Sequence, residues 1–220
     1  MSRNLLILVI LAALAAIPAR AVVIAQYLLN NSATSSDTQA NSIAGAVSAT
    51  GLGGLGYGTV ATQQGLHLTA ANTPSSVSAN NNFYSFTVTA MSGFVLNLNG
   101  ANIQIQDYST YSGVSFVIRS SLDNFASNIG SIAITTRNTW NSDTITLSGA
   151  GFNSLNSITF HIYPTDGNGG TTRNLYFDNI ILNGIVAVPE PSTWALTGFG
   201  LVFGGAGAAR WWRTRNVKLN

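Results

Sequence analysis

Apolar and polar residues alternate along much of this chain from residue 83 onward. In residues 83–90, Tyr84, Phe86 and Val88 are separated by serine and threonine. Successive side chains of a β-strand point to opposite faces, so a period of two predicts a strand with one buried face and one exposed face. The same alternation predicts further strands at 94–99, 102–106, 114–119, 131–135, 144–147, 157–163 and 175–182.

Turn-forming pairs such as Ser92-Gly93, Asn99-Gly100 and Ser112-Gly113 separate nearly all of these strands. Eight strands spaced by roughly 8 to 15 residues, with no convincing amphipathic helix, predict an all-β fold, an antiparallel β-sandwich of jelly-roll type. A right-handed β-helix is the alternative. We rank it lower because the sequence has no repeat of fixed period.

Residues 26–80 alternate less clearly and are rich in Ala, Ser, Thr, Asn and Gly. We predict strands near 26–29 and 66–70, with long surface loops between them. The glycine run 51–58 lacks the Lys-Ser/Thr pair of a phosphate-binding loop, and no helix start follows it. We therefore interpret this run as a flexible surface loop.

Composition limits both the architecture and the partners. The chain has 220 residues, enough for one sandwich with a segment left at each end, and only 7% of them are charged. Between residues 22 and 188 there are three arginines and six aspartates, which gives a formal charge of −3. Without clustered basic side chains, nucleic acid is not an expected partner. The absence of cysteine excludes disulfides, thiolate metal ligands and a cysteine nucleophile.

The N-terminal segment 1–21 has the pattern of a secretory signal peptide. Arg3 precedes an apolar run from 5 to 17, and Ala19-Arg20-Ala21 is a small-x-small site for signal peptidase. Cleavage after Ala21 is our preferred site, and residues 23–25 offer a second. A buried N-terminal helix is the alternative, but a helix that is apolar all round requires a larger core than this chain can build.

The C-terminal segment 188–215 has three parts. A proline motif at 188–192 precedes an apolar stretch at 193–209, and a basic cluster with two tryptophans follows at 210–215. About 17 helical residues at about 1.5 Å each, plus the tryptophans, can just cross a bilayer core of about 30 Å. The stretch therefore predicts a transmembrane helix. Basic residues favour the cytoplasmic side, which places the domain 22–187 outside.

This three-part tail resembles the PEP-CTERM sorting signal of Gram-negative bacteria that produce exopolysaccharide. The resemblance implies recognition by an exosortase, a transient anchor in the inner membrane, and delivery to the cell surface or the extracellular space, with Glu190 as a recognition residue. A proline-rich linker before an ordinary anchor is the alternative. The residues that carry the resemblance are Val188, Pro189, Glu190 and Pro191, and after the apolar stretch Arg210, Arg213 and Arg215.

The segment 116–184 resembles a domain type found upstream of such tails. Residues 118–125 and 175–184 carry this second resemblance, and they are similar to jelly-roll units of carbohydrate-binding modules and concanavalin-like sandwiches. The resemblance implies a shape and no particular ligand.

Catalytic chemistry is not expected. Glycoside hydrolysis requires two carboxyl groups about 5 to 10 Å apart, whereas the domain has no glutamate and its aspartates are dispersed near turns. His67 and His161 occupy polar positions of their strands, so we expect both to be surface or sheet-face residues. Asp178 lies in the middle of a strand, where we expect it to pair with Arg119 or Arg173, or to ligate a structural Ca²⁺; no other cofactor is predicted.

Exposed aromatic side chains beside amides are typical of surfaces that bind sugars. Asn138, Asn141 and Gln106 flank such residues here, although Trp140 packing at an edge of the core is an equal alternative. The candidates for carbohydrate contact are Trp140, Tyr163, Tyr108 and Tyr111.

Together these features favour a non-catalytic, exported surface or matrix protein that is sorted by an exosortase and associated with exopolysaccharide or biofilm. The alternative is a carbohydrate-binding module that acts on exopolysaccharide. A glycoside hydrolase ranks last, because no pair of carboxylates is evident in the sequence.

Overall fold

The computed structural model describes residues 21–36, 39–52, 55–70, 76–77, 81–166 and 173–189. The chain divides into two compact units, Met1–Ala187 and Val188–Asn220. The described part of the first unit is built from antiparallel strands and two short 3₁₀ turns, η2 (Ser121–Asp123) and η3 (Ala150–Phe152). Residues 1–20 of the predicted signal peptide 1–21 and the tail from Glu190 onward lie outside the described residues.

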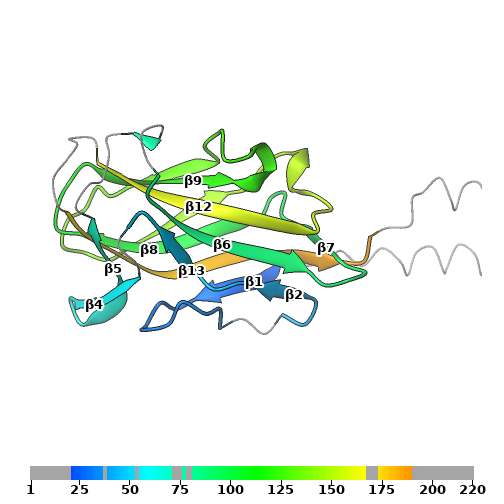
Figure 1. Cartoon of the computed structure of the whole chain (residues 1–220), viewed down its shortest axis with the longest axis horizontal. Helices are drawn as coiled ribbons and strands as arrows, with labels where there is room; N and C mark the ends of the chain where they lie inside the picture. The colour runs from blue at the N-terminus through cyan, green and yellow to red at the C-terminus, as the bar shows by residue number, and fades with distance from the viewer. Residues whose placement is uncertain are drawn as a thin grey trace, which may run out of the picture. The chain divides into compact units, whose positions relative to one another are not determined.

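The strands form two antiparallel sheets. In the first, the β13 sheet, the order is β11 (Asn141–Thr146), β8 (Asn102–Ser109), β13 (Arg173–Ala187), β5 (Gln63–Ala70) and β4 (Gly56–Val60), and β1 (Val22–Tyr27) and β7 (Val95–Asn97) also pair with β13. In the second, the β12 sheet, the order is β10 (Gly130–Ala133), β9 (Val114–Ser120), β12 (Ser157–Asp166), β6 (Phe83–Ala90) and β2 (Ser42–Ala44), and β3 (Ser48–Thr50) pairs with β6. Figure 1 shows β12 between β9 and β6, and β13 beside β8.

The two sheets pack face to face around one apolar core. Phe177 of the β13 sheet lies edge-on to Tyr84, with ring centroids 4.6 Å apart, and to Phe116 at 5.7 Å. Both partners belong to the β12 sheet, and all three side chains are fully buried. The predicted antiparallel sandwich is therefore confirmed, whereas its jelly-roll type stays a prediction.

The prediction of long loops between residues 30 and 65 is wrong. The structure places β2, β3 and β4 there, and β4 includes the end of the glycine run. A Cβ atom at Gly58 would lie 3.1 Å from Tyr176 Cε1 and 3.2 Å from His67 Cβ. The lack of a side chain thus lets β4 lie against these two residues, which is a reason for glycine other than flexibility.

Several predicted strands are longer in the structure. β8 continues to Ser109, and β13 has 15 residues with a register shift between Asp178 and Ile181. Asn179 within this shift has a φ of 48°, a left-handed conformation that asparagine tolerates. Among the described residues, no helix is long and apolar enough to cross a membrane.

Candidate functional site

The outward face of the β13 sheet gathers aromatic and amide side chains from β5, β13 and β8. Tyr176 pairs with His67 of β5 on one side and with Tyr108 of β8 on the other. Asp178, two residues further along β13, pairs with Gln106. Directly paired residues point to the same face, and the neighbour Phe177 is buried in the core, so this set points away from the core. We call it the amide and aromatic face; its members are Gln63, Gly65, His67, Gln106, Tyr108, Trp140, Tyr176 and Asp178.

Four rings on this face are in continuous contact. His67 and Tyr176 are stacked, with centroids 4.4 Å apart and planes inclined by 13°. Tyr176 meets Tyr108 edge-on at 5.9 Å, and Tyr108 lies 5.6 Å from Trp140. Aromatic pairs in such arrangements stabilise the fold in addition to the contribution of the area they bury. The face therefore carries a continuous row of contacting aromatic rings, within which Tyr108 is largely covered by its neighbours.

Trp140 reaches this face from the segment that precedes β11. Its Nε1 donates a hydrogen bond of 3.3 Å to the carbonyl oxygen of Val60 at the end of β4. A Cβ atom at Gly65 would lie only 3.0 Å from Trp140 Cη2. Since β8, β13 and β5 lie between β11 and β4, the indole extends over these strands, and the glycine at position 65 makes room for it.

Asp178 is the only charged side chain of the face, and it is 4% exposed. Gln63 Nε2 donates to Asp178 Oδ2 at 3.0 Å and to Gln106 Oε1 at 3.0 Å. The backbone N–H of Asn179 donates to Asp178 Oδ1 at 2.7 Å. Burial raises the pKa of Asp178, and the two hydrogen bonds oppose that shift. The carboxylate is thus held by amides.

The predicted pairing of Asp178 with Arg119 is wrong. Arg119 lies on β9 of the other sheet, where its Nε donates to Asn128 Oδ1 at 2.8 Å and its Nη1 donates to the Phe125 carbonyl oxygen at 3.0 Å. The side chain of Arg173 is outside the described set. Both Asp178 oxygens already accept hydrogen bonds, so a role as a Ca²⁺ ligand gains no support.

The structure brings together two of the four aromatic residues proposed from the sequence, Trp140 and Tyr108. Tyr163 belongs to β12 and contacts His161, Phe83 and Arg119 on the outward face of the other sheet. Tyr111 is 39% exposed in the loop after β8. His67 and Tyr176 were missed as ring partners because only the strand register reveals that they are adjacent.

His161 is on a sheet face, as predicted, but it is enclosed by other rings. Phe83 and Phe125 stack on its two sides, with centroids 3.8 Å and 3.6 Å away. Burial lowers the pKa of His161 to about 4, which keeps the imidazole neutral at physiological pH. His161 also lies beside Tyr163, whose hydroxyl is 3.0 Å from His161 Nδ1, so its imidazole is already engaged.

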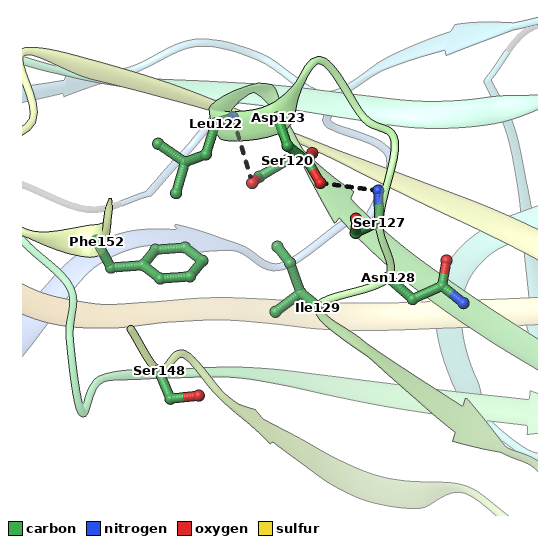
Figure 2. Close-up of a pocket in the computed structure, with 8 residues that line it drawn as sticks. All are labelled: Ser120, Leu122, Asp123, Ser127, Asn128, Ile129, Ser148 and Phe152. Atoms are coloured by element: carbon green, nitrogen blue, oxygen red, sulfur yellow. Dashed lines mark hydrogen bonds between the residues drawn. The ribbon is translucent and has the colours of Figure 1, made fainter. Parts of the chain in front are cut away.

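A separate pocket of about 300 Å³ lies where η2 and η3 meet the loop before β10. In Figure 2, Asp123 points to the backbone of Ser127, and Leu122, Ile129 and Phe152 supply apolar walls. Asp123 accepts hydrogen bonds from the N–H groups of Ser127 at 2.8 Å and Ala126 at 3.2 Å. The Ser127 side chain, and after it these backbone bonds, lower the pKa of Asp123. Its carboxylate therefore shapes the loop. The lining residues are Ser120, Leu122, Asp123, Ser127, Asn128, Ile129, Ser148 and Phe152.

Two aspartates that the sequence did not single out lie on the inward side of β8 and β11. Asp107 is completely buried, and burial, with Asp143 close by, raises its pKa to about 7. A polysaccharide cannot reach a carboxyl group with no exposed surface, so this pair does not provide the two accessible carboxylates of a glycosidase. In the described parts of the chain, no group of three or more His, Cys, Asp or Glu side chains is placed to hold a metal.

The fold and the site define a two-layer β-sandwich with an amide and aromatic sheet face. No protein-family model matches the sequence, and no curated protein matches it. The similar solved structures include the xylan-binding module CBM15, at 11% identity and a TM-score of 0.45, covering 76% of this chain and 97% of that chain. A family 6 carbohydrate-binding module from Clostridium cellulolyticum in complex with xylose matches at 12% identity and 0.40, covering 71% of this chain and 95% of that chain.

An α-L-arabinofuranosidase matches at 12% identity and a TM-score of 0.41, covering 74% of this chain but 27% of the enzyme. Likenesses with TM-scores under 0.5 do not establish a shared ligand or activity. A function for this domain therefore has to be inferred from the geometry of the face alone.

Proposed function

We propose that the domain is a non-catalytic carbohydrate-binding module whose ligand lies on the amide and aromatic face. The observation that carries this function is the unbroken row of rings from His67 to Trp140 beside a carboxylate held by Gln63. A pyranose has a flat side of C–H groups that packs on an aromatic ring, and hydroxyl groups at its rim that both donate and accept hydrogen bonds. The face offers partners for both.

The polar groups of the face favour a neutral glycan. The glutamine amides both donate and accept hydrogen bonds, and Asp178, which is nearly buried, orients the Gln63 amide. Between residues 22 and 188 the sequence has three arginines and no lysine, and the face itself has neither among its members. An acidic polysaccharide would bring its charge toward Asp178 without a compensating cation, so we expect it to bind more weakly.

Binding without hydrolysis follows from the count of accessible carboxyl groups. Cleavage of a glycosidic bond requires two carboxyl groups about 5 to 10 Å apart on either side of that bond. The face supplies Asp178 alone, and it is held by Gln63 and the Asn179 backbone. We therefore propose a role in retaining a polysaccharide rather than in processing one.

We further propose that the chain is exported and sorted to the cell surface through its tail. The motif at 188–192 follows directly after β13, and Val188 is 66% exposed. Two prolines favour an extended backbone and remove two N–H donors, which makes such a motif suited to another protein's active site and supports recognition by an exosortase. Deletion of residues 188–220 is expected to abolish surface display, and unchanged display would refute this part of the proposal.

Glycan binding is tested with the purified full-length chain by affinity electrophoresis against soluble neutral and acidic polysaccharides. Trp140→Ala is expected to weaken retention by a neutral glycan at least about tenfold, since buried aromatic anchors commonly contribute about 2 kcal/mol or more. Tyr163→Ala is the matched control, because this ring lies on the other sheet. Gln106→Ala repeats the test without removing an aromatic residue.

Equal losses for Trp140→Ala and Tyr163→Ala would show that the face is not the binding site. Retention of no polysaccharide in the panel by the folded wild-type chain would refute the function itself. Circular dichroism and the melting temperature of each variant distinguish lost binding from lost folding.

A further inference from the structure

A cluster of oxygen atoms lies between the sheets where β8 and β11 pair. Asp107 of β8 is opposite Asn141 of β11 in the register, and Asp143 follows two residues along β11. Alternate residues share a face, so Asn141 and Asp143 both point to the inward side, where Asp107 is completely buried. The residues are on the inner face of the sheet, opposite to the amide and aromatic face.

One oxygen of Asp107 has no hydrogen-bond partner in the part of the chain that the structure describes. Asp107 Oδ2 is fully buried without a hydrogen bond, while Oδ1 accepts only a long one, 3.4 Å, from Asn141 Nδ2. Buried polar atoms are nearly always paired, and a buried carboxylate requires a compensating charge or several donors. The described surroundings of Asp107 add a second carboxyl group, Asp143, instead of a cation.

Three oxygens converge on a single nitrogen of this cluster. Asn141 Nδ2 lies 3.4 Å from Asp107 Oδ1, 3.3 Å from the Thr136 carbonyl oxygen and 3.3 Å from the Thr139 carbonyl oxygen. Good N–H···O bonds are about 2.9 to 3.0 Å long, and an amide has two N–H groups for these three acceptors. One amide therefore satisfies these three oxygens poorly.

From this geometry we infer a Ca²⁺ site formed by the carboxylates of Asp107 and Asp143, the side-chain oxygen of Asn141 and the carbonyl oxygens of Thr136 and Thr139. Rotation of the Asn141 amide by a half turn exchanges its nitrogen for its oxygen and completes the set. Calcium takes six to eight ligands from carboxylates, carbonyls and water in flexible geometry. Its two charges balance the two carboxylates.

Calcium fits this set better than magnesium. Two of the five groups are backbone carbonyls of an irregular segment between β10 and β11. Calcium accepts carbonyl ligands and tolerates a flexible coordination geometry. Magnesium demands a near-ideal octahedron and retains several waters. Asp143 is half-buried and both threonines are exposed, so an ion can enter from the β11 edge although Asp107 is enclosed.

The proposed Ca²⁺ site does not depend on the proposed function, because none of its ligand residues belongs to the amide and aromatic face. The direct test is equilibrium dialysis of the full-length chain, stripped with EDTA, against CaCl₂ and separately against MgCl₂. We expect one Ca²⁺ per chain and weaker Mg²⁺ binding. At 100 times the dissociation constant, Ca²⁺ is expected to raise the melting temperature by about 5 to 10 °C.

Asp107→Asn and Asp143→Asn are each expected to remove stoichiometric Ca²⁺ binding and the thermal shift. Asp123→Asn is the matched control, since its carboxylate is bonded to amides of the loop after η2 and does not belong to this cluster. If Asp107→Asn does not fold, Asp143→Asn at the half-buried edge position gives the same test.

A wild-type chain that takes up no Ca²⁺ and melts at the same temperature with and without EDTA would overturn the inference. So would Ca²⁺ binding that survives both substitutions, because the ion would then lie elsewhere. If Asp107 and Asp143 merely share a proton, the chain will take up no Ca²⁺ and its melting temperature will be the same with and without EDTA.

Discussion

Replacing Tyr84 by phenylalanine is expected to stabilise this protein. Tyr84 is 0% exposed in the centre of the sandwich, and its hydroxyl has no hydrogen-bond partner among the described residues. Burial raises the pKa of Tyr84 above its usual range, as expected for a hydroxyl surrounded by apolar groups. The ring itself packs edge-on against Phe177, a contact that phenylalanine preserves.

The magnitude follows from two opposing contributions. Leaving a buried hydroxyl unsatisfied costs about 1 to 3 kcal/mol, and the substitution recovers this cost. The missing oxygen leaves a small void that offsets part of the gain. We expect the free energy of unfolding to rise by about 0.5 to 2 kcal/mol, and the melting temperature by roughly 2 to 6 °C for a domain of this size.

Tyr27→Phe is the matched control with the opposite sign. Tyr27 is also 0% exposed and packs on Phe86, but its hydroxyl donates a 2.7 Å hydrogen bond to the carbonyl oxygen of Gly45. Loss of this bond is expected to cost about 1 kcal/mol, because the carbonyl loses its donor. Urea unfolding followed by circular dichroism, with equal slopes for all variants, measures both changes. Destabilisation of the two variants by the same amount would refute the reasoning.

Three further predictions concern single positions. Gly65→Ala is expected to displace Trp140 and weaken glycan retention severalfold, whereas Gly151→Ala, whose new Cβ makes ordinary contact at 3.8 Å, leaves retention unchanged. Gly184→Ala brings a methyl group within 2.6 Å of two buried aliphatic side chains, so thermal melting should show a loss of about 1 to 3 kcal/mol. Folding lowers the pKa of His161 from 6.5 to about 4, so the neutral imidazole contributes to the free energy of unfolding above pH 6.5, and this contribution is lost as the pH falls toward 4. Between pH 7 and pH 5, the free energy of unfolding in urea should therefore fall more in the wild type than in His161→Phe.

Alternation in the sequence predicts the strands well because their burial is one-sided. Tyr84, Phe86 and Val88 point into the core as the period of two requires, and β6 has the predicted bounds 83–90. The pattern carries no information about which strands become neighbours. Asp178 and Gln63 are 115 residues apart in the sequence, and only the sheet order brings their side chains to 3.0 Å.

Two failures of the sequence prediction have physical causes. The glycine run predicts a loop because it lacks the signature of a phosphate-binding loop, but in β4 the absence of Cβ at Gly58 accommodates Tyr176 and His67. Asp107 was grouped with the turn-forming aspartates, and its burial was unexpected because an aspartate is almost never fully buried without a partner. Its role depends on Asn141, which the register alone places opposite it.

Trp140 and Asn141 link the two faces of the β13 sheet. They are consecutive residues, yet the indole of Trp140 extends over the outer face to Val60, whereas the amide of Asn141 bonds Asp107 on the inner side. An ion held by Asn141 and by the carbonyls of Thr136 and Thr139 would fix the segment from which Trp140 projects. Calcium would then strengthen glycan binding by ordering that segment before the ligand arrives, without touching the glycan.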